Sequence, residues 1–179
     1  MNLPDELSTD RLSLRVPHAA DADAIFARYA SDADVTRLVG WPRHRSLDDT
    51  RAFLAWDADT RASGGGSAYL VFDRRSGALL GSTGLAFEGD RRAMTGYVLA
   101  RDAWGHGYAT EALRAMVALA FGLGPVERLY AITHPSNTAS ERVLAKAAFS
   151  KEGTLRRHTV FPNLTASAAQ DVAMWARTS

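Results

Sequence analysis

The sequence contains no cysteine, and this absence excludes several kinds of chemistry. Disulfide bonds, thiolate nucleophiles and thiolate-ligated metals all require a cysteine side chain. The five histidines are far apart along the chain and none is spaced as a His-x-x-x-His pair, so we expect no metal site. Any catalysis must therefore come from other side chains and from the backbone.

Long apolar runs and an excess charge of one sign are also absent. No apolar run is long enough to span a bilayer, and the first residues, MNLPDELSTDR, lack the apolar core of a signal peptide. With 21 Lys and Arg against 20 Asp and Glu, the formal net charge of +1 gives no overall attraction to nucleic acid or an anionic membrane. We therefore expect a cytoplasmic protein with neither partner, and one domain over its 179 residues (1–179).

What the sequence does contain is a pattern of helices and strands typical of an α/β (α+β) fold. Periodicity predicts helices over 21–30, 32–39, from Ser46 to Gly64, 108–121 and 136–147. Seven strands are predicted over 11–16, 67–73, 78–87, 92–100, 128–133, 149–155 and 170–176, with a loop over 156–169. The second to fourth strands suit an antiparallel meander. The helix over 108–121 then crosses to a strand parallel to the last meander strand. We predict one mixed sheet of about seven strands with flanking helices.

One strand–turn–helix segment carries a chemical signal. Gly105 and Gly107 lie between the strand over 92–100 and the helix that opens at Tyr108. A helix start exposes free N–H groups, and glycine lets the backbone approach a ligand, so the segment suits a phosphate or diphosphate. Two other interpretations remain: a plain tight turn, or a dinucleotide site. The dinucleotide fingerprint would need a glycine at Thr110.

Several segments together resemble the GNAT acetyltransferases. WGHGYATEA, from Trp104 onward, resembles motif A of that family, although Trp104 stands where Gln or Arg is usual. STDRLSLR near the start, Gly40-Trp41-Pro42, NTASERVL from Asn137, and FSKEG from Phe149 also match, with Ala148 in place of a glycine. The resemblance covers nearly the whole chain and is closest to the ribosomal-protein N-terminal (Rim-type) branch. Two parallel strands that splay apart, the fourth and fifth of the predicted sheet, are expected from it.

The resemblance implies acetyl-CoA as co-substrate, no metal, and a primary amine as acceptor, either a protein N-terminus or a small molecule. The amine would attack the thioester directly in a ternary complex. The pantetheine arm would run along the backbone of Val98, Leu99 and Ala100, and the diphosphate would be bound by Gly105, His106, Gly107, Tyr108, Ala109 and Thr110. Asn137 would contact the cofactor arm, and Ser140 would give the departing thiolate its proton.

The catalytic residues are less strongly marked than the cofactor site. Relatives often carry an acidic residue where this chain has Met94, so Glu88 and His134 are the candidate bases. The alternative is that Glu88 is only solvated and that His134 is a loop residue bonded to the backbone. Thr138 and Glu141 have capping-box spacing, which would leave Asn137 and Ser140 free for other roles; the alternative is that both only cap the helix.

The aromatic residues and the acceptor leave further points open. Trp41 is the candidate for the acceptor site, whereas Trp56 is expected in the core. A non-catalytic acetyl-CoA sensor is the alternative function, and the protein is expected to be a monomer or homodimer.

Overall fold

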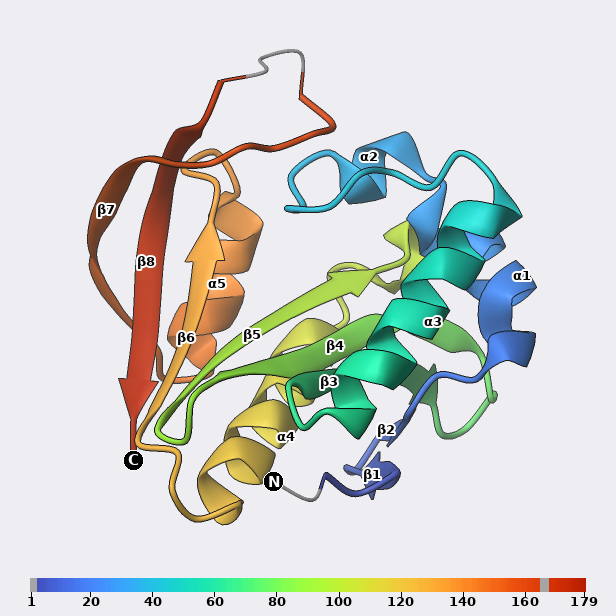
Figure 1. The fold of residues 1–179 in the computed structure, drawn as a ribbon, viewed down its shortest axis with the longest axis horizontal. Helices are drawn as coiled ribbons and strands as arrows, with labels where there is room; N and C mark the ends of the chain where they lie inside the picture. The colour runs from blue at the N-terminus through green and yellow to red at the C-terminus, as the bar shows by residue number, and fades with distance from the viewer. Residues whose placement is uncertain (1–2, 165–167) are drawn as a thin grey trace.

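A computed structural model describes residues 3–164 and 168–179 and arranges their strands in one eight-stranded sheet. In chain order the strands are β1 (Glu6–Ser8), β2 (Leu12–Arg15), β3 (Gly66–Asp73), β4 (Leu79–Glu88), β5 (Arg92–Leu99), β6 (Arg128–Thr133), β7 (Ser150–Thr159) and β8 (Gln170–Thr178). Their order in the sheet is β1-β2-β3-β4-β5-β6-β8-β7, and β5 and β6 are parallel while the other neighbours are antiparallel (Figure 1). The predicted mixed sheet and its antiparallel meander, β3 to β5, are confirmed.

The sheet differs from the prediction at two places. The additional strand, β1, pairs with β2 at the sheet edge. It has only three residues, which are too few to show a periodic pattern in the sequence. β7 continues to Thr159 and therefore occupies part of the segment predicted as a loop. Residues 165–167 of that predicted loop lie outside the described residues.

The helices are α1 (Ala22–Ile25), α2 (Ala33–Thr36), α3 (Leu47–Ala62), α4 (Tyr108–Gly122) and α5 (Thr138–Lys146). The predicted helix over 21–30 is not a single α-helix, because α1 passes into a π-helical turn over Phe26–Ala30. Ser31 favours this wider turn, since both its N–H and its hydroxyl donate to the Phe26 carbonyl, at 3.2 and 2.7 Å. Among the described residues, no helix combines the length and the apolar character that a membrane span needs.

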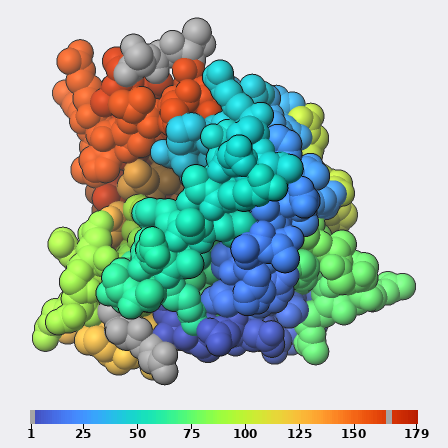
Figure 2. Space-filling model, turned by 45° about the vertical axis from the view of Figure 1, so that its right-hand side comes forward, coloured from blue at the N-terminus to red at the C-terminus, as the bar shows by residue number. Residues whose placement is uncertain are grey.

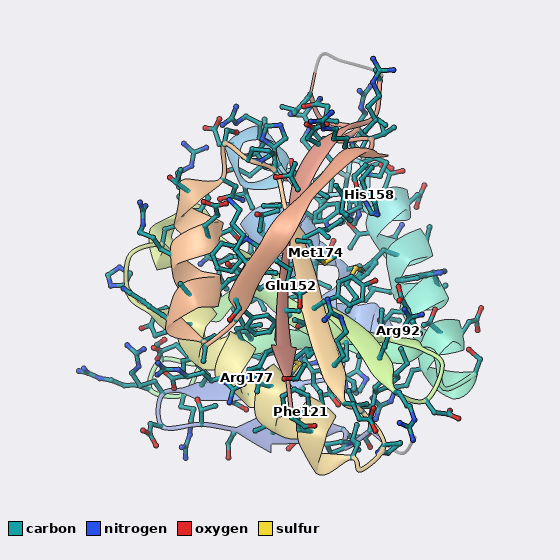
Figure 3. The ribbon with its side chains drawn as sticks, turned by 90° about the vertical axis from the view of Figure 1, so that its left-hand side faces the viewer. Arg92, Phe121, Glu152, His158, Met174 and Arg177 are labelled. Atoms are coloured by element: carbon teal, nitrogen blue, oxygen red, sulfur yellow. The ribbon has the colours of Figure 1, made fainter. Side chains whose placement is uncertain are left out.

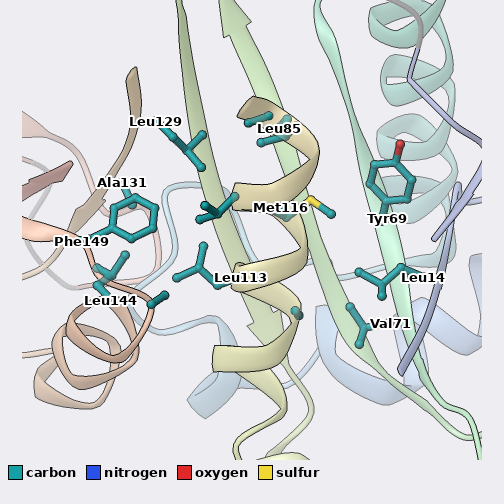
Figure 4. Close-up of a cluster of buried hydrophobic side chains, with 14 of the residues drawn as sticks. Leu14, Tyr69, Val71, Leu85, Leu113, Met116, Leu129, Ala131, Leu144 and Phe149 are labelled. Carbon is teal, nitrogen blue, oxygen red and sulfur yellow. The ribbon is translucent and has the colours of Figure 1, made fainter. Parts of the chain in front are cut away.

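Helices cover both faces of the sheet. α4 and α5 pack on one face and α3 lies on the other, as the edge-on view shows (Figure 3). α4 buries one stripe of side chains: Ala112, Leu113, Met116, Val117 and Ala120. Leu113 and Met116 meet Leu85 and Leu129 of the sheet (Figure 4). A second cluster, which includes Ile25, Leu54 and Leu70, packs α1 and α3 against the face of the sheet opposite α4. The sheet is thus packed on both sides.

A buried carboxylate fixes α3 to the start of β3. Asp57 is 4% exposed and accepts hydrogen bonds from the Ala68 N–H at 2.7 Å and the Ser67 hydroxyl at 3.4 Å. Burial raises the pKa of Asp57 above its ordinary 3.8, against the opposing effect of these two hydrogen bonds. The folded protein therefore holds this proton at pH values where the unfolded chain has released it. The contribution of Asp57 to stability must fall as pH rises from about 4 through its folded pKa.

Two substitutions test this assignment. Asp57→Ala is expected to lower the free energy of unfolding by about 1–3 kcal/mol, because the Ala68 N–H loses its acceptor. Asp57→Asn keeps an acceptor and has no charge, so we expect near-native stability at pH 7 and a weaker pH dependence between pH 4 and 7. Urea unfolding at both pH values measures this. Equal losses in the two variants would contradict it.

Candidate active site

β5 and β6 are paired over only their first three residues. Their register runs from Arg92 opposite Arg128 to Met94 opposite Tyr130. Beyond that point β5 continues beside β4 and β6 beside β8. The two parallel strands therefore open into a V-shaped gap, and Figure 1 shows their arrowheads diverging. This confirms the predicted splay and exposes strand edges that a ligand can use.

The start of α4 lies after the turn that follows β5, and its backbone donors are not capped. The other long helices begin at side-chain caps, Ser46 for α3 and Asn137 for α5. Gly107 is the N-cap of α4, and none of the described side chains caps it. The first helical bond runs from the Glu111 N–H to the Gly107 carbonyl, 3.1 Å, so the preceding N–H groups have no helical partner. Gly105 and Gly107 both have φ +81°, a left-handed conformation that glycine adopts without strain. This start has the geometry of an anion site.

A network from the beginning of the chain holds this turn. The Arg11 guanidinium donates to Glu111 at 2.7 Å and to the His106 carbonyl at 3.0 Å, and it lies 4.8 Å from the centre of the Tyr108 ring. The Thr9 hydroxyl donates to the same Glu111 carboxylate at 2.5 Å. Burial opposes ionisation of Glu111, but the hydrogen bonds from Thr9 and Arg11 outweigh it and lower the pKa of Glu111. The turn is thereby fixed to the connection between β1 and β2, across about a hundred residues of sequence.

The free edge of β5 presents one particular backbone group near its end. The Ala100 N–H donates to Leu80 of β4 at 2.8 Å. Successive residues of a strand direct their N–H and C=O groups to opposite sides, so those of Leu99 point away from β4 and into the gap. The Leu99 carbonyl accepts from the Trp104 indole at 2.8 Å. Within the predicted segment Val98 to Ala100, Leu99 is therefore the residue whose N–H faces the gap.

The start of α5 differs from the prediction. Its N-cap is Asn137, whose side-chain oxygen accepts from the Ser140 N–H at 3.1 Å. The expected capping box of Thr138 and Glu141 is therefore wrong, because the residue before the helix makes the cap. Asn137 retains its amide N–H₂ for another partner, since capping uses only the oxygen.

The Ser140 hydroxyl lies against a tyrosine that the sequence analysis did not select. The Ser140 and Tyr97 hydroxyl oxygens are 2.7 Å apart and join α5 to β5 across the gap. Burial raises the pKa of Tyr97 to about 12, so its proton is present at neutral pH. Nearby at the end of β6, the buried Thr133 hydroxyl has no hydrogen-bond partner in the described chain. The gap is thus bridged by a pair of hydroxyls.

On the α3 face, the centre of the sheet is open. Met94 is 37% exposed, Gly96 is exposed, and a Cβ placed on Gly96 would meet no atom within 4 Å. At the start of this opening the Tyr130 hydroxyl donates to the Glu88 carboxylate. Burial, and then Glu88, raise the pKa of Tyr130 to about 12. We call the opening over Met94 and Gly96 the acceptor cleft.

The wall and roof of the acceptor cleft come from distant segments. In Figure 2 the loop before α3 and α3 itself (cyan to teal) meet the β7–β8 connection (orange-red), and β6 residues are recessed between them. Asn163 makes this junction: its amide donates to the carbonyls of Thr36 at 2.7 Å and Trp41 at 2.9 Å, and its oxygen accepts from the Arg43 N–H at 2.7 Å. Trp56 is 61% exposed beside Phe53, so its expected core position is wrong.

His134 is held in place by its neighbours. Its Nδ1 accepts from the Ser136 N–H at 3.1 Å, and its Nε2 lies 2.9 Å from the Gln170 side-chain oxygen. The ring also packs edge-on against Phe161 at 5.0 Å. Both ring nitrogens of His134 are thus engaged by neighbouring polar groups.

The comparison with protein families decides the assignment. The sequence model of the Acetyltransferase (GNAT) domain matches residues 11–150. The chain belongs to the GNAT acetyltransferase family. This match includes the glycine turn, both splayed strands and α5.

Relatives and solved structures agree with this GNAT assignment. The "Uncharacterized N-acetyltransferase YoaA" of Bacillus subtilis is 32% identical over 154 residues, which cover 85% of this chain and 86% of the relative. A GNAT-family acetyltransferase from Bacillus anthracis has a TM-score of 0.83 at 23% identity, over 97% and 98% of the two chains. RimL, a ribosomal L7/L12 α-N-protein acetyltransferase solved with coenzyme A, has a TM-score of 0.84 at 22% identity, over 98% and 97%. These structures show that the fold is shared.

In this GNAT chain the structure brings together more than the sequence motifs indicated. Tyr97 follows Gly96 on the predicted strand. Since side chains alternate between the two faces of a strand, the sequence could have placed Tyr97 on the face opposite Gly96. Arg11 lies within a segment that was selected only as a strand. Asn163 carried no signal, because a single Asn in a loop is too common to mark a junction.

Proposed function

We propose that this GNAT acetyltransferase moves the acetyl group of acetyl-CoA to a primary amine within a ternary complex. The main support is the uncapped start of α4 beside the splayed strands. A diphosphate suits the free N–H groups after Gly105 and Gly107, and a pantetheine arm suits the open edge of β5.

The cofactor residues are proposed as follows. The turn and first helical residues, Gly105, His106, Gly107, Tyr108, Ala109 and Thr110, bind the diphosphate through their backbone. Val98, Leu99 and Ala100 line the pantetheine arm, and the Leu99 N–H donates to the thioester carbonyl oxygen as negative charge develops on it. The free amide N–H₂ of Asn137 binds the arm from the other side.

Bound acetyl-CoA supplies the thioester that the amine attacks. The amine nitrogen bonds to the acetyl carbon, the carbon–sulfur bond breaks, and one proton leaves the amine while the thiolate takes another. Ser140 donates to the departing sulfur, and Tyr97 replaces that proton through their 2.7 Å hydrogen bond. No covalent enzyme intermediate is needed. The acceptor is a small-molecule amine or a protein N-terminus, the latter being the acceptor that RimL's name states.

Glu88 is proposed as the base that receives the amine proton through a chain of waters, because it pairs with Arg92, seven residues before Leu99 on β5. It lies on the acceptor side of the sheet and is bonded to Tyr130, which pairs with Met94 in the cleft floor. Glu88→Gln is expected to lower kcat/KM for the amine about a hundredfold near pH 7, because a general base typically contributes that much. The affinity for acetyl-CoA should be unchanged. An unaltered pH profile of kcat/KM in the variant would assign the proton transfer to water alone.

Asn163 is proposed to position the wall of the acceptor cleft. Asn163→Ala removes three hydrogen bonds to the end of α2 and the loop before α3, and it should raise the KM for the amine about tenfold, with the Kd for acetyl-CoA unchanged. Asn163→Asp should be at least as damaging, since a carboxylate would face the Thr36 and Trp41 carbonyls. Steady-state kinetics with each substrate varied measures both constants. Equal changes in the two would contradict a role confined to the acceptor side.

The direct test of the function is an assay of acetyl transfer. Purified protein with acetyl-CoA and a panel of amines should release free CoA thiol in proportion to acetylated amine. The alternative, a non-catalytic acetyl-CoA sensor, predicts binding of acetyl-CoA without amine-dependent thiol release.

A further inference from the structure

A row of aromatic side chains runs from the loop before α3 onto α3. The ring centres of Trp41 and His44 are 5.3 Å apart, and those of His44 and Phe53, and of Phe53 and Trp56, are both 6.2 Å apart. Trp41 and Phe53 pack against the same cluster as Val98, which lies in the splayed half of β5. The row therefore begins at a hydrophobic cluster that β5 shares and ends at the exposed Trp56.

The charges around this row do not suit an acceptor with several positive charges. Asp48 pairs with Arg51 at 2.8 Å, Asp49 caps α3, and Asp57 is buried beneath that helix. Glu88 lies on the open face and already accepts from Tyr130. A polyamine needs two or more separated carboxylates, whereas a single carboxylate is enough for one amine.

The floor of the cleft is apolar as well. Met94 is 37% exposed within a central strand, and the space above Gly96 is unfilled. A flat apolar group placed over this floor would cover Met94, and aromatic rings attract such a group in edge-on or offset arrangements. The Asn163 hydrogen bonds fix the Trp41 carbonyl and the Arg43 N–H, so this wall is preformed.

We propose that the acceptor is a small monoamine that carries an aromatic group. Its ring packs against Phe53 and Trp56, and its amine reaches the gap between β5 and β6 on the side of Glu88. This inference rests on the proposed acetyl transfer and adds the class of acceptor to it.

The experiment compares amines at saturating acetyl-CoA. 2-Phenylethylamine and tryptamine are compared with propylamine, spermidine and a peptide with a free N-terminal serine, and free thiol is followed. We expect kcat/KM for the two aromatic amines to exceed the other values at least tenfold. Phe53→Ala and Trp56→Ala should each raise the KM for 2-phenylethylamine about tenfold. Phe72→Ala is the matched control. Phe72 lies on β3, packs against the same cluster and stacks under Arg15, so its loss should leave the KM for 2-phenylethylamine as in the wild type.

A steric variant tests the location of the cleft. Gly96→Val suits a strand and fills the open space, so it should abolish turnover of 2-phenylethylamine while the Kd for acetyl-CoA stays the same. Higher kcat/KM for spermidine or the peptide would overturn the inference and leave acetyl transfer standing. Release of no thiol with any amine would overturn both.

Discussion

Replacing Gly107 with valine is expected to weaken CoA binding about tenfold or more. Gly107 has φ +81°, and a left-handed conformation costs a residue with a Cβ about 1–2 kcal/mol, more when it is β-branched. The new side chain would also meet the Arg11 guanidinium, since even its Cβ would lie 3.4 Å from Nη2. The turn must relax, and the free N–H groups at the start of α4 lose their common direction. Calorimetric titration with CoA measures the loss.

A second glycine separates binding from general strain. Gly64 follows α3 with φ +77°, and nothing lies within 4 Å of a Cβ built there. Gly64→Val therefore has a similar backbone cost at a position far along the chain from the turn. Both variants should lose about 1–2 kcal/mol of unfolding free energy, and only Gly107→Val should lose CoA affinity. Native CoA affinity in Gly107→Val would contradict the role of the turn.

Ser140→Ala is expected to lower kcat about a hundredfold without changing the affinity for acetyl-CoA. The Ser140 hydroxyl is the proposed proton donor to the departing thiolate, and loss of a general acid typically costs about this factor. The N-cap of α5 should be retained, because Asn137 bonds the Ser140 backbone N–H and not its side chain. Thermal unfolding of the variant should therefore be close to that of the wild type.

Tyr97→Phe tests the partner of that hydroxyl. Tyr97 lies 2.7 Å from Ser140 and, with a pKa raised to about 12, remains protonated throughout the usual assay range. Its loss should lower kcat by about tenfold, less than the loss of Ser140, and the double variant should be no slower than Ser140→Ala because the two act as one unit. Additive losses would indicate separate roles, and native turnover in Ser140→Ala would reject the proposed acid.

The sequence predicted the parts of the fold that depend on local periodicity. α4 was predicted to within one residue because its apolar spacing and its terminal glycines agree. β6 was predicted with its observed ends. By contrast, β1 is stabilised only by pairing with β2, and the π-helical turn before Ser31 depends on a side-chain hydrogen bond, so neither leaves a periodic pattern.

The candidate site also has features that the sequence predicts and features that depend on tertiary contacts. The glycine turn could be found from the sequence because its backbone conformation demands glycine at Gly105 and Gly107. The Tyr97–Ser140 pair and the three hydrogen bonds of Asn163 join residues 43 or more positions apart, with spacings up to 127. Such contacts depend on tertiary packing, which a single sequence does not encode as a local pattern.

The central claim is that the start of α4 and the splayed strands bind the diphosphate and pantetheine arm of CoA. Isothermal titration of the folded protein with CoA tests it most directly. The account predicts one site per chain, with an affinity that falls in Gly107→Val and is retained in Gly64→Val. Absence of any binding of CoA or acetyl-CoA to the folded wild-type protein would contradict it.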